Sequence, residues 1–259
     1  MAVDTNHYEE VKQEAVDGLE DRISQMDGLL KAYRSGAIDA GALFSELRIN
    51  AHSIKSVSNL SEMGAIKAIS HRFEDYLVDI DIKGLNDSIL AALQVFIDHL
   101  SKSLDNFSSG ILEDISAAMR SLPAKGGFDF NVDDITTTDT EVMLVMEPGI
   151  ATKIVTKELL ECGYRMVNVA STMDALMLIP SMRPDLVIVS RVMPELDGVD
   201  LACAVRAMPA TRDIPVALLT SEALDSGTLR NLPKDVPIMR KGGNFADDVA
   251  EVFVKLGLI

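Results

Sequence analysis

The sequence predicts two domains, an all-α bundle of four or five helices followed by a (βα)5 domain of the α/β class with a doubly wound parallel sheet. Its 259 residues exceed the size of one ordinary domain and suffice for two. Apolar residues recur at three- and four-residue steps up to residue 122, which is the period of a helix. After residue 140, short apolar runs alternate with amphipathic segments, a pattern typical of strands separated by helices.

Four apolar stripes predict four helices in residues 1–122. They are Val11, Ala15, Leu19, Ile23, Met26, Leu30 and Tyr33; then Phe44, Leu47, Ala51 and Ile54; then Ile66, Ile69, Phe73, Leu77 and Ile80; and finally Ile89, Leu93, Phe96, Leu100, Leu104 and Phe107. Short links at Ser35-Gly36, Asn59-Leu60-Ser61 and Lys83-Gly84 favour antiparallel neighbours. A weaker repeat, Ile111, Ile115 and Met119, predicts a short fifth helix.

Residues 123–140 read as a linker, because they combine Pro, two Gly, a Thr run and four Asp without periodicity. In residues 141–259, the runs MLVME, RMVNVA, DLVIVS, PVALLT and VPIMR predict five strands. Burial of such runs on both faces indicates a parallel sheet with helices on each side. In this fold class, functional sites lie at the carboxyl ends of the strands.

Composition excludes several classes of function. A formal charge of −16 disfavours nucleic acid and anionic membrane surfaces as partners. No stretch of about 18 apolar residues and no leader-like N-terminus is present in the sequence, so we expect a cytoplasmic protein without a membrane span. Cys162 and Cys203 stand alone in the sequence, which favours reduced thiols over a disulfide or a zinc site.

A candidate phosphoryl acceptor lies on the second predicted helix. His52 is out of step with the apolar stripe and shares a face with Arg48, Lys55 and Ser56, so we expect it to be exposed. An imidazole attacks phosphorus through a neutral nitrogen, and a carboxylate best holds the proton of the other nitrogen. Taken alone, an exposed histidine is more often a solvated residue than a nucleophile.

The third predicted helix supplies the carboxylate. Lys67, His71 and Glu74 form a polar stripe on the side away from its apolar residues. If the two helices pack antiparallel, Glu74 accepts a hydrogen bond from one nitrogen of His52 and the other nitrogen faces solvent. Lys55, one turn further on, would then neutralise the oxygens of an incoming phosphoryl group.

The segment Ala51-His52-Ser53-Ile54-Lys55, followed by His71-Arg72-Phe73-Glu74, resembles the histidine phosphotransfer (HPt) domains. It is most similar to the N-terminal phosphotransfer domain of the chemotaxis histidine kinases, over roughly residues 8–122. The resemblance implies that His52 accepts and donates the phosphoryl group, that Glu74 fixes its tautomer and that Lys55 and His71 assist. That family usually has one or two glycines after the lysine, whereas Ser56-Val57-Ser58 stands here, which bears on partner choice or transfer rate.

The second domain resembles the receiver domain of response regulators, a flavodoxin-like fold, over about residues 141–256. The stretch DLVIVSRVMPELDG, which ends at Gly198, resembles the family pattern D-L-[VI]-L-[LI]-D-x-x-M-P-x-M-D-G, and Thr220 and Lys241 fall on the family's threonine and lysine. Ser190, however, occupies the position of the phosphorylated aspartate.

The remaining receiver positions also depart from the family. Glu147-Pro148 replaces the acidic pair, Ile238 occupies the aromatic switch position and Gly242 replaces a proline. An acyl phosphate needs a carboxylate, and Mg²⁺ needs several hard oxygen ligands, so we expect a pseudo-receiver that is not phosphorylated and binds no metal.

The resemblance further implies that such domains associate through their fourth and fifth helices and fifth strand. On this basis Val236, Phe245, Val249 and Phe253 either form a surface that docks a kinase or a second copy, or belong to the core between helix and sheet.

Together these observations predict a phosphorelay phosphoprotein of two-component signalling. His52 would receive a phosphoryl group from a receiver aspartate or a separate histidine kinase and pass it to a receiver aspartate, or drain one receiver as a phosphate sink. No nucleotide-binding motif is visible in the sequence, so we expect no kinase activity and no cofactor of its own, with Mg²⁺ supplied by the partner receiver or kinase. The pseudo-receiver would bind partners or mediate a homodimer. The alternative is a non-phosphorylated scaffold that binds kinases or response regulators.

Overall fold

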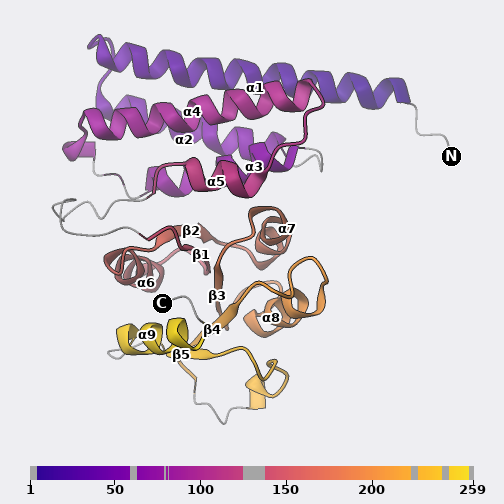
Figure 1. Ribbon diagram of the computed structural model, residues 1–259. Coiled ribbons are helices and arrows are strands. Elements are labelled where there is room, and N and C mark those ends of the chain that lie inside the picture. The colour runs from indigo at the N-terminus through magenta and orange to yellow at the C-terminus, as the bar shows by residue number, and fades with distance from the viewer. Residues whose placement is uncertain are drawn as a thin grey trace. The chain divides into compact units, whose positions relative to one another are not determined.

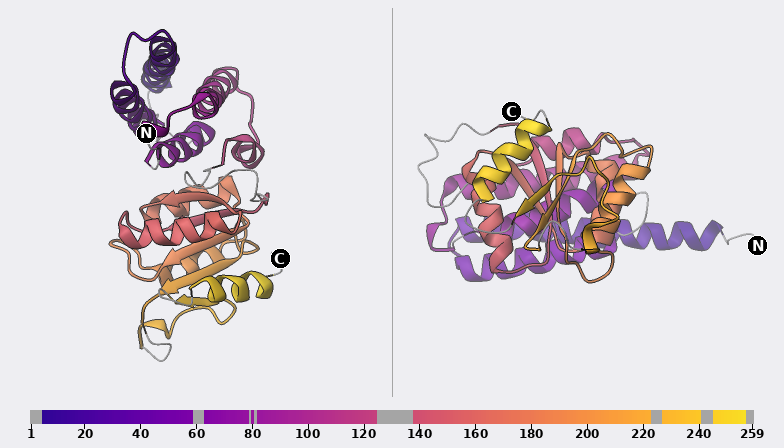
Figure 2. Two further views of the ribbon diagram at one scale, coloured as in Figure 1. Left: turned by 90° about the vertical axis from the view of Figure 1, so that its left-hand side faces the viewer. Right: turned by 90° about the horizontal axis from the view of Figure 1, so that it is seen from below.

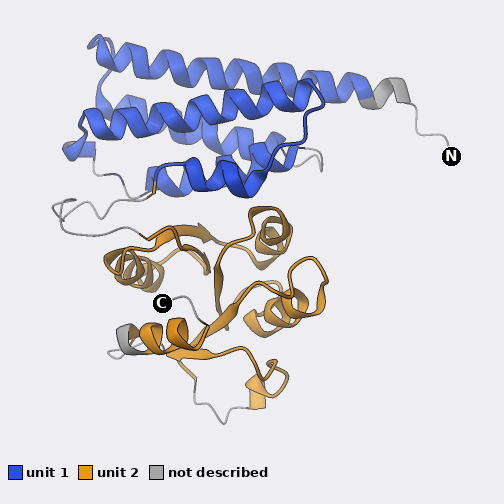
Figure 3. Cartoon of the chain, viewed as in Figure 1, with its two compact units in different colours: residues 1–123 blue, residues 124–259 orange. Residues whose placement is uncertain are grey.

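In the computed structural model, four long helices from residues 1–123 pack side by side and a shorter fifth follows (Figure 1). The structure describes residues 5–58, 63–78, 80, 82–124, 138–222, 227–240 and 245–256. The helices are α1 (Thr5–Arg34), α2 (Ala40–Val57), α3 (Gly64–Val78), α4 (Asp87–Ser108) and α5 (Ile115–Ser121), with a 3-10 turn η2 (Ile82–Gly84) before α4. We call this unit the helical bundle; residues 124–259 form a second compact unit (Figure 3).

Local signals in the sequence set the starts of three of these helices. The side chains of Asp39, Asn86 and Asp114 accept hydrogen bonds from main-chain amides in the first turns of α2, α4 and α5. Such caps satisfy amides that have no partner inside the helix. Gly36 adopts a φ of 75° in the turn that ends α1, a conformation that favours glycine.

The predicted apolar stripes of α2, α3 and α4 form the core of the bundle, and only Phe107 at the end of the last stripe is half-buried. Phe73 of α3 stacks on Phe96 of α4 with 4.9 Å between ring centroids. Two positions differ from expectation. Val11 is 43% exposed, because it lies in the N-terminal part of α1, before the buried residues of that helix begin. Ile111 is 58% exposed and lies in the loop before α5, not in the fifth helix.

The second unit, here called the α/β unit, contains the five predicted strands. They are β1 (Glu141–Val145), β2 (Arg165–Val169), β3 (Leu186–Ser190), β4 (Val216–Thr220) and β5 (Ile238–Arg240), and they alternate with α6 (Ile150–Glu161), α7 (Thr172–Met182), α8 (Gly198–Ala207), η3 (Gly227–Leu229) and α9 (Phe245–Lys255). All neighbours pair in parallel in the order β2-β1-β3-β4-β5, which confirms the doubly wound prediction.

Strand β1 begins two residues earlier than the apolar run MLVME indicated. Glu141 is 4% exposed and pairs with Arg165 of β2 in the first register position. The Nε of Arg165 lies 3.5 Å from Oε2 of Glu141, so an ion pair allows this charged residue to enter the sheet. The predicted linker, residues 123–140, falls mainly on residues 125–137, which lie outside the described residues.

Helices cover both faces of the sheet (Figure 2). Helices α6 and α9 pack on one face and share a core with alternate residues of the strands, while α7 and α8 pack on the other. Val236, Phe245, Val249 and Phe253 are all at most 5% exposed. Of the two alternatives, the core between helix and sheet is therefore confirmed: Phe245, Val249 and Phe253 pack with strand residues, and these buried side chains do not form a docking surface. Within the described ranges, no helix combines the length and apolarity that crossing a membrane requires.

Candidate functional site

Helices α2 and α3 bring His52 and Glu74 into contact. The imidazole Nδ1 of His52 lies 2.9 Å from Oε1 of Glu74. One turn away, Nη2 of Arg48 donates a hydrogen bond to the main-chain oxygen of Leu77. Residue numbers thus fall along α3 as they rise along α2, so the two helices are antiparallel. The contact expected from antiparallel packing is present.

The second oxygen of Glu74 is held by Lys55. Its Nζ lies 2.5 Å from Oε2 of Glu74, and the side chain of Lys55 is only 25% exposed. His52 and Lys55 are three residues apart and lie on the same face of α2, so the carboxylate receives one partner at each oxygen. We expected Lys55 to face an incoming phosphoryl group; in this structure it binds the carboxylate instead.

This geometry sets the chemical state of the imidazole. A carboxylate only accepts hydrogen bonds, so Nδ1 of His52 carries a proton, and in the neutral form of the ring the lone pair lies on Nε2. Nε2 lies on the far side of the ring from Nδ1, and the side chain of His52 is 69% exposed. A reacting phosphorus atom can therefore approach Nε2 from solvent while Glu74 holds the ring.

His71 does not belong to an exposed polar stripe as predicted. It is 6% exposed, and its neighbours Arg72 and Phe73 are also buried. The reason is that α3 contacts α2, α4 and α5, so little of its surface reaches solvent. Of the predicted stripe, Lys67 and Glu74 are half-buried and reach solvent in part, whereas His71 is buried.

Exposed apolar side chains border the histidine. Ile49 precedes His52 by three residues on α2 and is 54% exposed; Val78 follows Glu74 by four residues on α3 and is 59% exposed. Residues at these spacings share a helix face, so both lie about one turn from the imidazole. Both side chains are therefore accessible to a partner that covers the imidazole.

The carboxyl edge of the sheet holds the residues predicted for a degenerate receiver site. Glu147 and Pro148 follow β1 and are exposed. Ser190 ends β3 and Thr220 ends β4, and each is 2% exposed. Lys241 lies outside the described residues.

The two hydroxyl groups at this edge make contacts with the main chain. Oγ of Ser190 donates to the main-chain oxygen of Val192 at 3.3 Å, and Oγ1 of Thr220 accepts from the amide of Glu222 at 3.0 Å. These bonds stabilise the turns that leave β3 and β4.

An ion pair that the sequence analysis missed crosses the same edge. Nη1 of Arg191, the residue after Ser190, lies 3.3 Å from Oε1 of Glu222, two residues after Thr220. A sequence signal was available, because residues that follow neighbouring parallel strands meet at one edge. The pair places a guanidinium on the residue that follows Ser190.

Metal ligands do not gather in the described parts of the chain, since no group of three or more His, Cys, Asp or Glu residues there could hold an ion. Both cysteines are free, and burial raises the pKa of the Cys162 and Cys203 thiols.

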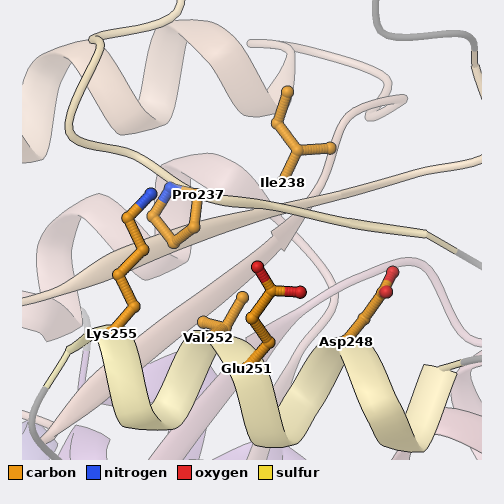
Figure 4. A pocket seen from close by; sticks show the side chains of 6 residues that line it. All are labelled: Pro237, Ile238, Asp248, Glu251, Val252 and Lys255. Atoms are coloured by element: carbon orange, nitrogen blue, oxygen red, sulfur yellow. The ribbon is translucent and has the colours of Figure 1, made fainter.

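A small hollow lies between β5 and α9 (Figure 4). Its volume is about 120 Å³, well below the roughly 300 Å³ of small-molecule pockets. Asp248, which lines it, already accepts a hydrogen bond from the amide of Arg240 at 2.7 Å. The small volume of the hollow and the existing hydrogen bond of Asp248 therefore argue against a small-molecule site.

Comparison with known proteins gives likenesses to solved structures only: no protein-family model and no curated protein matches the chain. The receiver domain of a sensor histidine kinase from Pseudomonas aeruginosa PAO1, solved with a magnesium ion in its active-site cleft, is 24% identical with a TM-score of 0.41. The alignment covers 46% of this chain and 98% of that one. The signal receiver domain of a histidine kinase from Syntrophus aciditrophicus is 25% identical with a TM-score of 0.42, covering 46% and 92%. A response regulator from Desulfuromonas acetoxidans is 23% identical with a TM-score of 0.40, covering 46% and 98%.

Proposed function

We propose that this chain is a cytoplasmic phosphorelay protein of two-component signalling and that its helical bundle is an HPt-type domain. His52 receives a phosphoryl group from a receiver aspartate or a separate histidine kinase and passes it to a receiver aspartate. The observation that carries this proposal is the exposed imidazole whose Nδ1 is held 2.9 Å from Oε1 of Glu74. The sequence motif around His52 and Glu74 supports the same function.

The transfer step uses only the free nitrogen of the ring. The lone pair of Nε2 forms a bond to phosphorus while the bond between phosphorus and the carboxylate oxygen of the donor aspartate breaks, and the electron pair stays on that oxygen. The ring becomes a cation whose Nδ1–H still donates to Glu74, so the carboxylate stabilises the product. The Mg²⁺ that such transfers need comes from the partner receiver or kinase.

The two units have different roles in this proposal. Ile49 and Val78 give a partner an apolar contact beside His52. The α/β unit ends β3 with Ser190 in place of an aspartate and has Glu147 exposed after β1, so it acts as a binding module for partners or for a second copy and not as an acceptor.

The test is transfer from receiver domains that carry a labelled phosphoryl group. Full-length protein is mixed with each labelled receiver, and we expect label that is labile in acid and stable in base, as for phosphohistidine. His52→Ala should remove this label completely. His99→Ala is the matched control, because His99 lies on α4 and contacts Ser121, away from the Glu74 carboxylate, so its label should persist.

The result that would contradict the relay is absence of such label on the wild-type protein with every receiver of its own organism. Equal labelling of the His52→Ala variant would also contradict it. In the first case the scaffold function remains, and it predicts binding to kinases or receivers without transfer.

A further inference from the structure

We propose that Arg48 is a positioning residue, which keeps Glu74 against His52 by tying α2 to the last turn of α3. The inference rests on the proposed function, since it names a residue that prepares His52 for phosphoryl transfer. It is carried by a separate contact, the hydrogen bond from Nη2 of Arg48 to the main-chain oxygen of Leu77 at 2.8 Å.

The position of this bond links it to the site. Arg48 precedes His52 by four residues, and Leu77 follows Glu74 by three, so the bond joins the same two helix faces one turn away. Three residues of α2, namely Arg48, His52 and Lys55, therefore contact α3 along one stripe. The bond from Arg48 is the end of this stripe nearest the C-terminus of α3.

The carbonyl that Arg48 binds lacks a partner within its own helix. α3 ends at Val78, and the last four carbonyls of a helix have no intrahelical donor. A cation at this end also interacts favourably with the helix dipole. The guanidinium thus supplies a charge-assisted donor where the helix would otherwise fray.

Fraying of the last turn of α3 would displace Glu74. Glu74 is the residue just before the last four of α3, and its carboxylate has to meet Nδ1 of His52 within hydrogen-bond distance. A displacement of about 1 Å would lengthen the 2.9 Å contact beyond a normal hydrogen bond. The imidazole would then lose its preference for the proton on Nδ1.

The experiment compares full-length Arg48→Ala, Arg48→Lys and Arg48→Gln with the wild type. The ¹⁵N chemical shifts of the His52 ring in the unphosphorylated protein report the fraction of neutral imidazole with its proton on Nδ1. The second readout is the rate of phosphoryl uptake from one labelled receiver, and circular dichroism checks folding. Arg34→Ala is the matched control, because it removes an exposed arginine from the last turn of α1.

We expect Arg48→Ala to lower the Nδ1-protonated fraction and to slow uptake about tenfold, as a small misplacement of a catalytic group does. Arg48→Lys should recover part of both, since an ammonium group also donates to a carbonyl, and Arg34→Ala should match the wild type.

A wild-type tautomer fraction in folded Arg48→Ala would overturn the inference. If that variant does not fold, the other two decide: a lowered Nδ1-protonated fraction in Arg48→Gln with partial recovery in Arg48→Lys would support the inference, and wild-type fractions in both would overturn it. The tautomer fraction does not depend on phosphorylation, so it tests Arg48 even if the wild type takes up no phosphoryl group and the proposed function fails.

Discussion

The helical bundle and the α/β unit differ in what their polar side chains contact. In the bundle, Glu74 engages one nitrogen of His52 and leaves the other in solvent. At the carboxyl edge of the sheet, Ser190 and Thr220 bond to the main chain, and Arg191 pairs with Glu222. The bundle site leaves an exposed imidazole held at one nitrogen, whereas the polar groups at the edge of the sheet bond to one another or to the main chain.

This contrast shows that architecture and chemistry depend on different residues. The sheet order and its two helical layers follow from the buried apolar runs of the α/β unit. Acceptor chemistry depends on a few carboxylates at strand ends, which it lacks at Ser190 and Pro148. The arrangement of a sheet therefore does not by itself indicate the chemistry at its edge.

The largest effect should come from removing the carboxylate of the bundle. Glu74→Ala leaves Nδ1 of His52 without an acceptor, so we expect phosphoryl uptake to slow about 10²-fold, the lower range for loss of acid–base assistance. Glu74→Gln, which can still accept through its amide oxygen, should fall between this variant and the wild type. Rates of label transfer from one receiver measure both. Glu20→Gln on the exposed side of α1 is the control, and a wild-type rate in Glu74→Ala would show that the carboxylate does not prepare the ring.

The next effect tests whether the two units work separately. A Cβ at Gly198 would lie 2.4 Å from the main-chain oxygen of Ser190 and 2.9 Å from Cδ1 of Leu218. Gly198→Ala should therefore destabilise the α/β unit by about 1–3 kcal/mol, the usual cost of overpacking. Hydrogen exchange in urea can measure this at the amides of β3, while label uptake at His52 should be unchanged. In Gly149→Ala the added Cβ meets nothing within 4 Å, so it serves as control. A parallel loss of uptake in Gly198→Ala would show that the bundle depends on the α/β unit.

A smaller effect concerns the stability of the bundle in acid. Hydrogen bonds from Lys31 and then Gln94 hold the pKa of the Asp27 carboxyl below its ordinary value. A lowered pKa means that this carboxylate stabilises the bundle above about pH 4, and that the contribution is lost as pH falls through the folded-state pKa. Asp27→Asn should cost at most about 1 kcal/mol at pH 7, because the side chain is partly exposed, and less near pH 2. Urea unfolding at pH 7 and pH 2 measures the free energy of unfolding of Asp27→Asn, with Asp21→Asn as the control. An equal loss of stability at both pH values would contradict a lowered pKa of Asp27.

The smallest effect is an expected absence of change. Ser190→Asp introduces a carboxylate at the end of β3, but only Glu147 of the Glu147-Pro148 pair after β1 is acidic, and Arg191 is paired with Glu222 nearby. Mg²⁺ requires several oxygen ligands in near-octahedral geometry. We therefore expect no Mg²⁺-dependent labelling of this variant by acetyl phosphate. Stoichiometric labelling at residue 190 would show that the edge of the sheet keeps a working metal site.

The sequence predicted most of the fold because periodicity reports burial directly. The stripes of α2, α3 and α4 and four of the five strands fall where their apolar patterns indicated, whereas β1 starts at Glu141 through an ion pair with Arg165 that no pattern reveals. Periodicity could not show whether Phe245 and Val249 belong to the core or to a docking surface, because an apolar helix face can pack either on the sheet or on a partner.

The candidate site was predictable in part. The spacing of His52 and Glu74 indicated their contact, since both helices are regular and antiparallel. The burial of His71 depends on how α2, α4 and α5 pack around α3, which is a tertiary feature. The partner of Lys55 was ambiguous for a similar reason: a long side chain on a helix face can reach several acceptors.

The most direct test of the account is to ask which atom carries phosphorus in the loaded protein. Full-length protein labelled with ¹⁵N in its histidines is charged from a phosphorylated receiver, and ³¹P–¹⁵N correlation identifies the bonded nitrogen. We predict a single phosphorus on Nε2 of His52, with Nδ1 still protonated. Phosphorus on Nδ1 of His52, on another histidine or on any residue of the α/β unit would contradict it.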